Sequence, residues 1–314
     1  MRASDVDAAT TTMTPTSDDF APSRRWQRAI DALRLTFWRA AASGLVPARW
    51  FNRGLPPAEA RAARSGELSI EIVSHCWNYA HLLVYQLSSL VHFPPQHADV
   101  TVTVFYAPED ERTAALLRFV GAFEVPRVRW NWQPLPPPYL FRRAIGRNRA
   151  ALVSRADWVW FTDCDLMFRD GCLDALAQQL QGRRDALAYP RIERCTDLLA
   201  DDDPRLRQTT PALVDIEAAD FTPREPGRAT GPLQITHGDV ARALGYCAPI
   251  AFYQQPAAAW CKAHEDRAHR WLLQTQGTPL DVPGVYRIRH VSKGRYGEGS
   301  AVSRVRSWLR QHQG

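Results

Sequence analysis

The feature that most constrains the fold is an apolar run that stops at two carboxylates. Residues 158–161 read W-V-W-F, and Asp163 and Asp165 follow almost at once. A short run without polar interruption is typical of a strand that helices cover on both faces, as in parallel sheets. Ligand sites in such sheets lie at the carboxyl ends of the strands. The sequence therefore predicts a buried strand that places two acidic groups at a site.

Two carboxylates one residue apart have two interpretations. Their hard oxygen donors suit a divalent cation, which can in turn bind a diphosphate. Alternatively, Asp163 only caps the turn that follows the strand. The same spacing recurs at Asp201 and Asp203, but Pro204 follows and no strand precedes. We expect a solvated loop there.

Strand and helix patterns alternate before this run. Such alternation predicts an α/β fold with a Rossmann-like, doubly wound sheet and the strand order 3-2-1-4. In that order the first and fourth strands are neighbours, so Ser74 and His75 would lie beside Asp163. The strands are expected at 69–73, 100–106, 125–132 and 158–161, and the helices at about 79–91, 108–120 and 139–154.

The second half of the chain is less regular. A long polar stretch, 193–227, is expected to be a functional or mobile loop. Around it we expect helices at 172–180, 240–245 and 264–275, and strands at 186–190, 231–236 and 282–291.

The ends of the chain differ in composition from its middle. We expect disorder over 1–22, a basic amphipathic helix and connector over 23–66, one domain over 67–300 and a basic helix over 301–314. Trp26, Ile30, Leu33 and Phe37 recur at helical spacing in the first helix. This stripe either packs against the domain, which is the commoner arrangement, or lies on an anionic membrane surface.

Composition limits the classes of protein. The 314 residues are 45% hydrophobic, which is enough for a large core. The net charge of +6 is compatible with nucleic acid, anionic lipid or a phosphorylated substrate. No zinc finger, basic zipper or RNA-recognition motif is present, so we expect no nucleic-acid partner. The six cysteines form no C-x-x-C pair, which argues against a zinc site or a disulfide framework.

The sequence contains neither an apolar stretch of about 18 residues nor a signal-peptide pattern at its start. We therefore expect a cytoplasmic protein, in solution or peripheral at the inner face of the membrane.

From Leu68 to about Val291 the sequence resembles the GT-A fold glycosyltransferases, most closely those of family 2. The resemblance depends on the order and spacing of four short motifs. These are Arg147-Asn148 before the D-x-D strand, Gly238-Asp239 through Gly245, Glu265-Asp266, and His290.

The resemblance implies a hexosyltransferase that moves a sugar from a nucleotide-sugar donor to a hydroxyl of a glycan or lipid-linked acceptor, with inversion, in cell-envelope glycan or polysaccharide synthesis. It implies Mn²⁺ or Mg²⁺ held by Asp163, Asp165 and His290, and a mixed oxygen and imidazole site suits Mn²⁺ somewhat better. The general base would be Asp266 or Glu265, with a slight preference for Asp266. The remaining donor and acceptor contacts would come from Ser74, His75, Arg147, Asn148, Asp163, Gly238, Asp239, Lys293 and Arg295.

Two other classes of function are compatible with parts of the pattern. A protein on the same scaffold could bind nucleotide-sugars or glycans without turnover. A haloacid dehalogenase type phosphatase also uses a D-x-D motif, but it needs Thr or Val where this chain has Met167, and it places the motif on its first strand. The phosphatase is therefore the weaker alternative.

Overall fold

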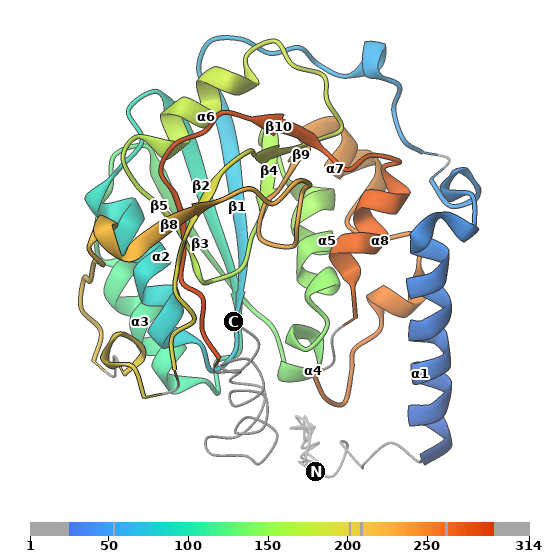
Figure 1. Cartoon of the computed structure of the whole chain (residues 1–314), viewed down its shortest axis with the longest axis horizontal. Coiled ribbons are helices and arrows are strands. Elements are labelled where there is room, and N and C mark those ends of the chain that lie inside the picture. The colour runs from blue at the N-terminus through green and yellow to red at the C-terminus, as the bar shows by residue number, and fades with distance from the viewer. Residues whose placement is uncertain (1–24, 53, 201, 208–209, 261–262, 292–314) are drawn as a thin grey trace, which may run out of the picture.

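A computed structural model describes residues 25–52, 54–200, 202–207, 210–260 and 263–291. Its main feature is a seven-stranded sheet with the order β10-β6-β9-β4-β1-β2-β3 (Figure 1). Strands β1 to β4 are parallel, and β9 is antiparallel to β4 and β6. The predicted mixed α/β sheet, with 3-2-1-4 order in its first half, is confirmed. The strands are β1 (Leu68–Cys76), β2 (Ala98–Tyr106), β3 (Val128–Pro134), β4 (Trp158–Phe161), β6 (Leu187–Pro190), β9 (Gln234–His237) and β10 (Thr278–Leu280).

Helices cover both faces of this sheet. Successive side chains of a strand point to opposite faces. Ser74 of β1 contacts Gln86 of α2, whereas the next residue, His75, lies against Gly146 of α5. Helices α2 and α5 therefore lie on opposite faces of β1. The helices are α1 (Arg25–Ala40), α2 (Ala80–His92), α3 (Glu111–Gly121), α4 (Pro137–Leu140), α5 (Arg143–Val153), α6 (Cys172–Leu180), α7 (Gly238–Leu244) and α8 (Glu265–Leu272).

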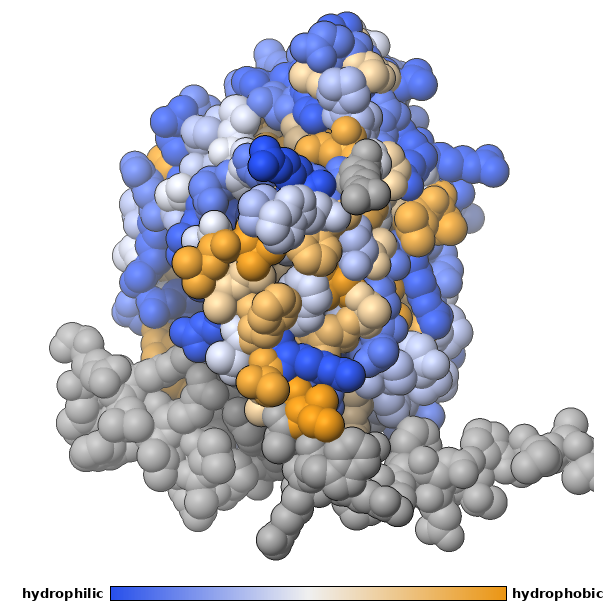
Figure 2. All heavy atoms as spheres, turned by 90° about the vertical axis from the view of Figure 1, so that its right-hand side faces the viewer, coloured by the Kyte–Doolittle hydropathy of each residue, from blue (hydrophilic) through white to orange (hydrophobic). Residues whose placement is uncertain are grey.

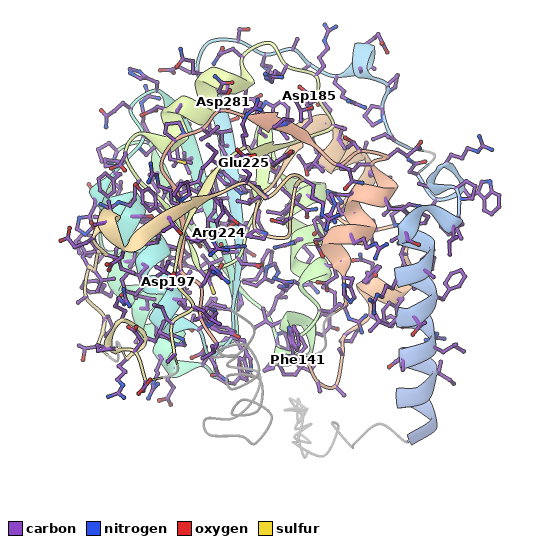
Figure 3. The ribbon with its side chains drawn as sticks, viewed as in Figure 1. Phe141, Asp185, Asp197, Arg224, Glu225 and Asp281 are labelled. Atoms are coloured by element: carbon purple, nitrogen blue, oxygen red, sulfur yellow. The ribbon has the colours of Figure 1, made fainter. Side chains whose placement is uncertain are left out.

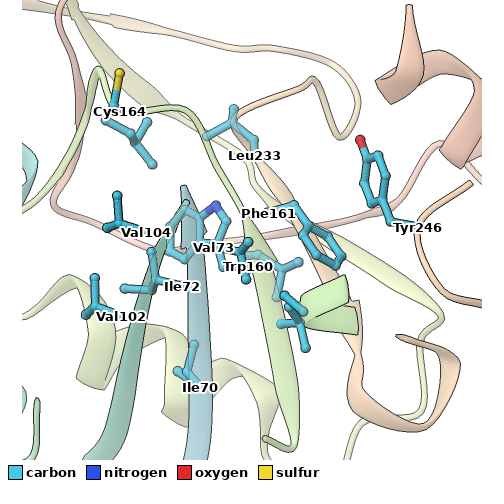
Figure 4. Packing of buried hydrophobic residues seen from close by; sticks show 14 of the residues in the cluster. Ile70, Ile72, Val73, Val102, Val104, Trp160, Phe161, Cys164, Leu233 and Tyr246 are labelled. Atoms are coloured by element: carbon cyan, nitrogen blue, oxygen red, sulfur yellow. The ribbon is translucent and has the colours of Figure 1, made fainter. Parts of the chain in front are cut away.

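Strand β4 runs through the middle of the core (Figure 4). All four of its residues are buried. Trp160 packs edge-on against Phe168 at 5.0 Å between ring centroids, and Phe161 packs against Tyr246 at 4.8 Å. Each such aromatic contributes roughly 1.5–3 kcal/mol through burial. This burial on both faces fixes the position of the acidic residues that follow β4.

A second sheet was missed by the sequence patterns. It has the order β5-β11-β7-β8 and is formed by β5 (Leu166–Phe168), β7 (Glu193–Thr196), β8 (Phe221–Arg224) and β11 (Val285–Arg287). The expectation that 193–227 is a loop is therefore wrong, because β7 and β8 lie within it. The expected single strand over 282–291 is also wrong, since only Val285–Arg287 is a strand there. These strands have three or four residues each, too few for a periodic pattern to stand out.

The N-terminal helix packs with a different face from the one expected. Leu35 and Trp38 of α1 lie against the core, whereas Ile30, Leu33 and Phe37 are exposed. The expected packing of this stripe on the domain is therefore wrong for those three residues. The segments expected at 1–22 and 301–314 lie outside the described residues. Within the described part of the chain, no helix is long and apolar enough to cross a bilayer.

Helix α5 approaches β1 very closely at Gly146. A Cβ at this position would overlap Nε2 of His75 and lie 2.9 Å from Cδ2 of Phe105. Only glycine therefore lets the helix lie this near the strand.

We predict that Gly146→Ala lowers the free energy of unfolding by about 1–3 kcal/mol, because overpacking outweighs the better helix propensity of alanine. Urea denaturation measures the change. Gly54→Ala is the control, since its Cβ would make only an ordinary 3.5 Å contact with the Ala243 carbonyl. Equal stability of the two variants would contradict the tight contact.

Candidate active site

The carboxyl ends of β1 and β4 lie side by side. The Thr162 amide donates to the Val73 carbonyl at 3.0 Å, so the chain that leaves β4 continues along β1. This contact brings Asp163 to the edge where Ser74 and His75 end β1. The arrangement is the one that the expected strand order implies.

A buried glutamine supports the turn that carries the two acidic residues. The Gln86 amide donates to the carbonyls of Asp163 at 2.9 Å and Leu166 at 3.0 Å. Its Oε1 accepts from the Ser74 hydroxyl at 2.6 Å. Ser74 therefore lies in a buried network beneath the turn, and its expected contact with a donor stays a prediction.

Two arginines of α5 hold Asp163. Arg143 donates to Oδ1 of Asp163, and Nη2 of Arg147 donates to the same oxygen at 3.1 Å. Burial alone would raise the pKa of Asp163, but the two guanidinium groups outweigh it and lower the pKa to about 2. Asp163 is therefore an ionised carboxylate between two cations at neutral pH.

Arg147 is fully buried and connects separate parts of the chain. Besides Asp163 it donates to the carbonyls of Thr162 at 2.9 Å and Gly231 at 3.2 Å, and to the Tyr246 hydroxyl at 2.8 Å. Asn148 accepts from the Tyr246 amide at 3.0 Å. The Arg147-Asn148 pair thus fixes the walls of the site.

Of the two acidic residues that begin α8, one is buried and one is open. Glu265 accepts from the Ala144 amide at 3.3 Å and pairs with Nε of Arg143 at 3.8 Å. It therefore stabilises the start of α5 through hydrogen bonding and charge. The side chain of Asp266 is 32% exposed and pairs with Arg270 at 3.2 Å.

Asp266 and Asp163 flank Gly231. A Cβ on this glycine would lie 4.0 Å from both Oδ2 of Asp163 and Cγ of Asp266. Because glycine has no side chain, the space between the two carboxylates stays open. Asp266 therefore faces the arginine and Asp163 cluster from the opposite wall.

His75 lies behind this cluster. Its ring stacks on Phe105 at 5.1 Å, and neither ring nitrogen makes a hydrogen bond. Burial, together with the charges of Arg147 and Arg143, lowers the pKa of His75 well below its usual range. The imidazole is therefore neutral.

An aromatic pair lies next to the cluster. Phe141, labelled in Figure 3, lies between α4 and α5 and packs edge-on against Trp77 at 6.1 Å. Trp77 directly follows β1. The pair therefore joins the end of β1 to the start of α5 beside Arg143.

The expected metal ligands come from segments that do meet. The Ile288 amide donates to the Asp165 carbonyl at 2.9 Å, and His290 forms an isolated bridge with Leu199. Among the residues that the structure describes, however, no three His, Cys, Asp or Glu side chains form a group that could hold a metal ion. Asp163 is already bound by two guanidinium groups. This arrangement does not fit a cation held by Asp163, Asp165 and His290.

Gly238 and Asp239 lie elsewhere. Strand β9 is antiparallel to β4 and pairs His237 with Trp158, the first residue of β4. Asp239 accepts from the Ala62 amide at 2.8 Å and from Arg242 at 2.7 Å. Both expected substrate contacts are thus at the opposite edge of the sheet from Asp163, which corrects the expectation. Lys293 and Arg295 lie outside the described residues.

Sequence reasoning missed Arg143, Gln86, Gly231 and Tyr246. Arg143 had a detectable signal, since it precedes Arg147 by four residues and so shares its helix face. Gln86 and Tyr246 are ordinary residues of an apolar helix and a turn, and only tertiary contacts show their roles.

The fold and the cluster define an α/β protein with a charged cleft at the carboxyl edge of its sheet. No protein-family model matches the chain, and neither does any curated protein.

Two solved structures are similar in fold. One is the mannosyltransferase PcManGT from Pyrobaculum calidifontis in complex with GDP-Man and Mn²⁺, with a TM-score of 0.42 and 16% identity over 88% of this chain and 72% of that chain. The other is S. aureus TarS, residues 1–349, in complex with UDP-GlcNAc, with a TM-score of 0.43 and 11% identity over 73% of this chain and 60% of that chain.

We predict that Asp163→Asn destabilises the protein by about 2 kcal/mol at neutral pH. The pKa of Asp163 is depressed in the folded state, so its stabilising effect is complete above the unfolded value near 3.8 and is lost as the pH falls toward about 2. Urea unfolding of both proteins from pH 7 downward should show curves that converge below about pH 4. A difference that stays constant with pH would refute the ion pair.

Proposed function

We propose that this protein transfers a sugar from a nucleotide-sugar donor to a hydroxyl group of an acceptor. The observation that carries the proposal is the placement of Asp266 opposite Arg143, Arg147 and Asp163 across Gly231. One wall of the cleft supplies positive charge and the other supplies a carboxylate. Transfer from a diphosphate needs both.

The arginine wall suits the leaving group. Breaking the bond between a sugar and a diphosphate leaves negative charge on the phosphate oxygens, which preorganised cations stabilise. The side chain of Arg143 is 32% exposed, whereas Arg147 is buried. Arg143 is therefore the guanidinium that can reach the phosphates, while Arg147 keeps Asp163 in place. Guanidinium groups match phosphate oxygens two at a time.

Asp266 suits the role of general base. The acceptor hydroxyl must lose its proton as it attacks the anomeric carbon, and a carboxylate facing that carbon can take it. Glu265 is buried and occupied by the Ala144 amide and Arg143. We therefore assign the base to Asp266 and a positioning role to Glu265. A single displacement of this kind inverts the anomeric centre.

The acceptor is proposed to be a glycan or a lipid-linked sugar, as the sequence resemblance implies. No step of this mechanism passes through a metal ion, because the carboxylate of Asp163 is already engaged by Arg143 and Arg147.

The function is tested first with a panel of nucleotide-sugars, each assayed with and without Mn²⁺ by thermal shift and by donor hydrolysis. We predict that at least one donor raises the melting temperature, because ligand binding stabilises the folded state. Asp266→Asn should keep this shift and lose turnover by about a hundredfold or more. A donor that binds without any turnover by the native protein would instead indicate a binding protein.

We predict that Arg143→Gln weakens donor binding by about tenfold or more, because it removes a charge-assisted hydrogen bond to phosphate. Arg149→Gln is the matched control, since Arg149 lies on the same helix but is exposed and stacks over Tyr139. Titration calorimetry with the donor found in the panel measures both. Equal donor affinities for the two variants would remove Arg143 from the site.

A further inference from the structure

Exposed apolar side chains gather on the N-terminal part of the molecule. In the described part of the chain, eight large apolar side chains are exposed, and five of them lie between residues 30 and 50. Figure 2 looks onto this face and shows apolar residues among charged ones. The five are Ile30, Leu33, Phe37, Leu45 and Trp50, with exposed fractions of 38%, 71%, 53%, 78% and 62%.

The outward direction of this face is fixed by packing on the other side of α1. Trp38 and Phe51 enclose Trp271 of α8, with ring centroids 6.4 and 5.4 Å from it. The Trp271 indole donates to the Val46 carbonyl at 2.9 Å, and the Asn52 amide donates to the Leu272 carbonyl. Helix α1 thus has one apolar face buried in the domain and a second one exposed to solvent.

The exposed face is positively charged. Arg34, Arg39 and Arg49 are exposed around the apolar side chains. Asp31 is the only acidic residue between 30 and 52, and it lies 3.9 Å from Arg34. Surface-binding amphipathic segments combine Trp, Phe and Leu with basic residues in this way.

We propose that the outer face of α1, with Leu45 and Trp50, docks on an anionic phospholipid surface. The apolar side chains would enter the boundary between headgroups and acyl chains, and the arginines would bind the headgroup phosphates. The face lies parallel to the surface and does not cross it. This inference does not depend on the proposed transfer reaction.

Charge argues against two other occupants of this face. A second copy of the chain would bring the same three arginines against these, and like charges repel. Residues 292–314 carry five basic residues and one acidic residue, so they would be repelled too. Residues 1–24 have four acidic residues but few large apolar side chains to cover the stripe. Anionic lipid complements both the charge and the apolar surface.

The test is co-sedimentation of the full chain with vesicles. We expect binding to phosphatidylcholine vesicles that contain phosphatidylglycerol, weakening as salt is raised, and little binding to phosphatidylcholine alone. The double variant Leu33→Glu with Phe37→Glu should lower partitioning by about tenfold or more. Arg34→Gln with Arg39→Gln should lower it by roughly twentyfold, at about fivefold for each arginine.

Leu152→Glu with Val153→Glu is the matched control, because both side chains are exposed and apolar but lie at the end of α5. This variant should bind vesicles like the native protein. Circular dichroism and nucleotide-sugar binding should be unchanged in every variant, which separates this proposal from the proposed function.

Three results would overturn the proposal. They are no binding of the native protein to anionic vesicles, equal loss in the α1 and α5 variants, and a native dimer, detected by sedimentation velocity, that Leu33→Glu with Phe37→Glu dissociates. The last result would assign this face to a second copy of the chain.

Discussion

The pairing of Asp163 with Arg143 and Arg147 is the interaction on which the cleft depends. A fully buried guanidinium without a carboxylate costs several kcal/mol, and a buried carboxylate without a cation does too. Each therefore requires the other. Through Arg147 the pair also holds the end of β4, the Gly231 turn and Tyr246 after α7. Four segments that are distant in sequence are thus fixed around one charge cluster, which is why the cleft can be preorganised without a bound ligand.

Much of the main sheet could be predicted from the sequence because its strands are long or wholly apolar. The W-V-W-F run, the alternation of strands and helices and the helix Cys172–Leu180 all follow from local patterns. The second sheet could not, because its strands are three or four residues long and pair with partners far away in the chain. The exposed face of α1 was assigned to the core because a helix with two apolar faces gives the same spacing as a helix with one.

The site was predicted only in part, for a related reason. The position of Asp163 beside the end of β1 follows from strand order, and order is a property of parallel sheets in general. The misplacement of Gly238-Asp239 has another cause. They follow β9, and because β9 is antiparallel to β4 its end lies at the amino edge of the sheet. A sequence read in one direction does not reveal that reversal. The partners of Asp163 were missed because an arginine's role depends on which carboxylate it meets.

The contact between α1 and α8 has a mechanical consequence. Helix α8 has eight residues and so is about 12 Å long, with Trp271 near one end and Asp266 near the other. A short, well-packed helix moves as a rigid rod, so any displacement of the Trp38 and Phe51 clasp shifts the carboxylate at its far tip. The N-terminal extension is therefore a lever joined to the reaction centre, not an appendage that could be trimmed without effect.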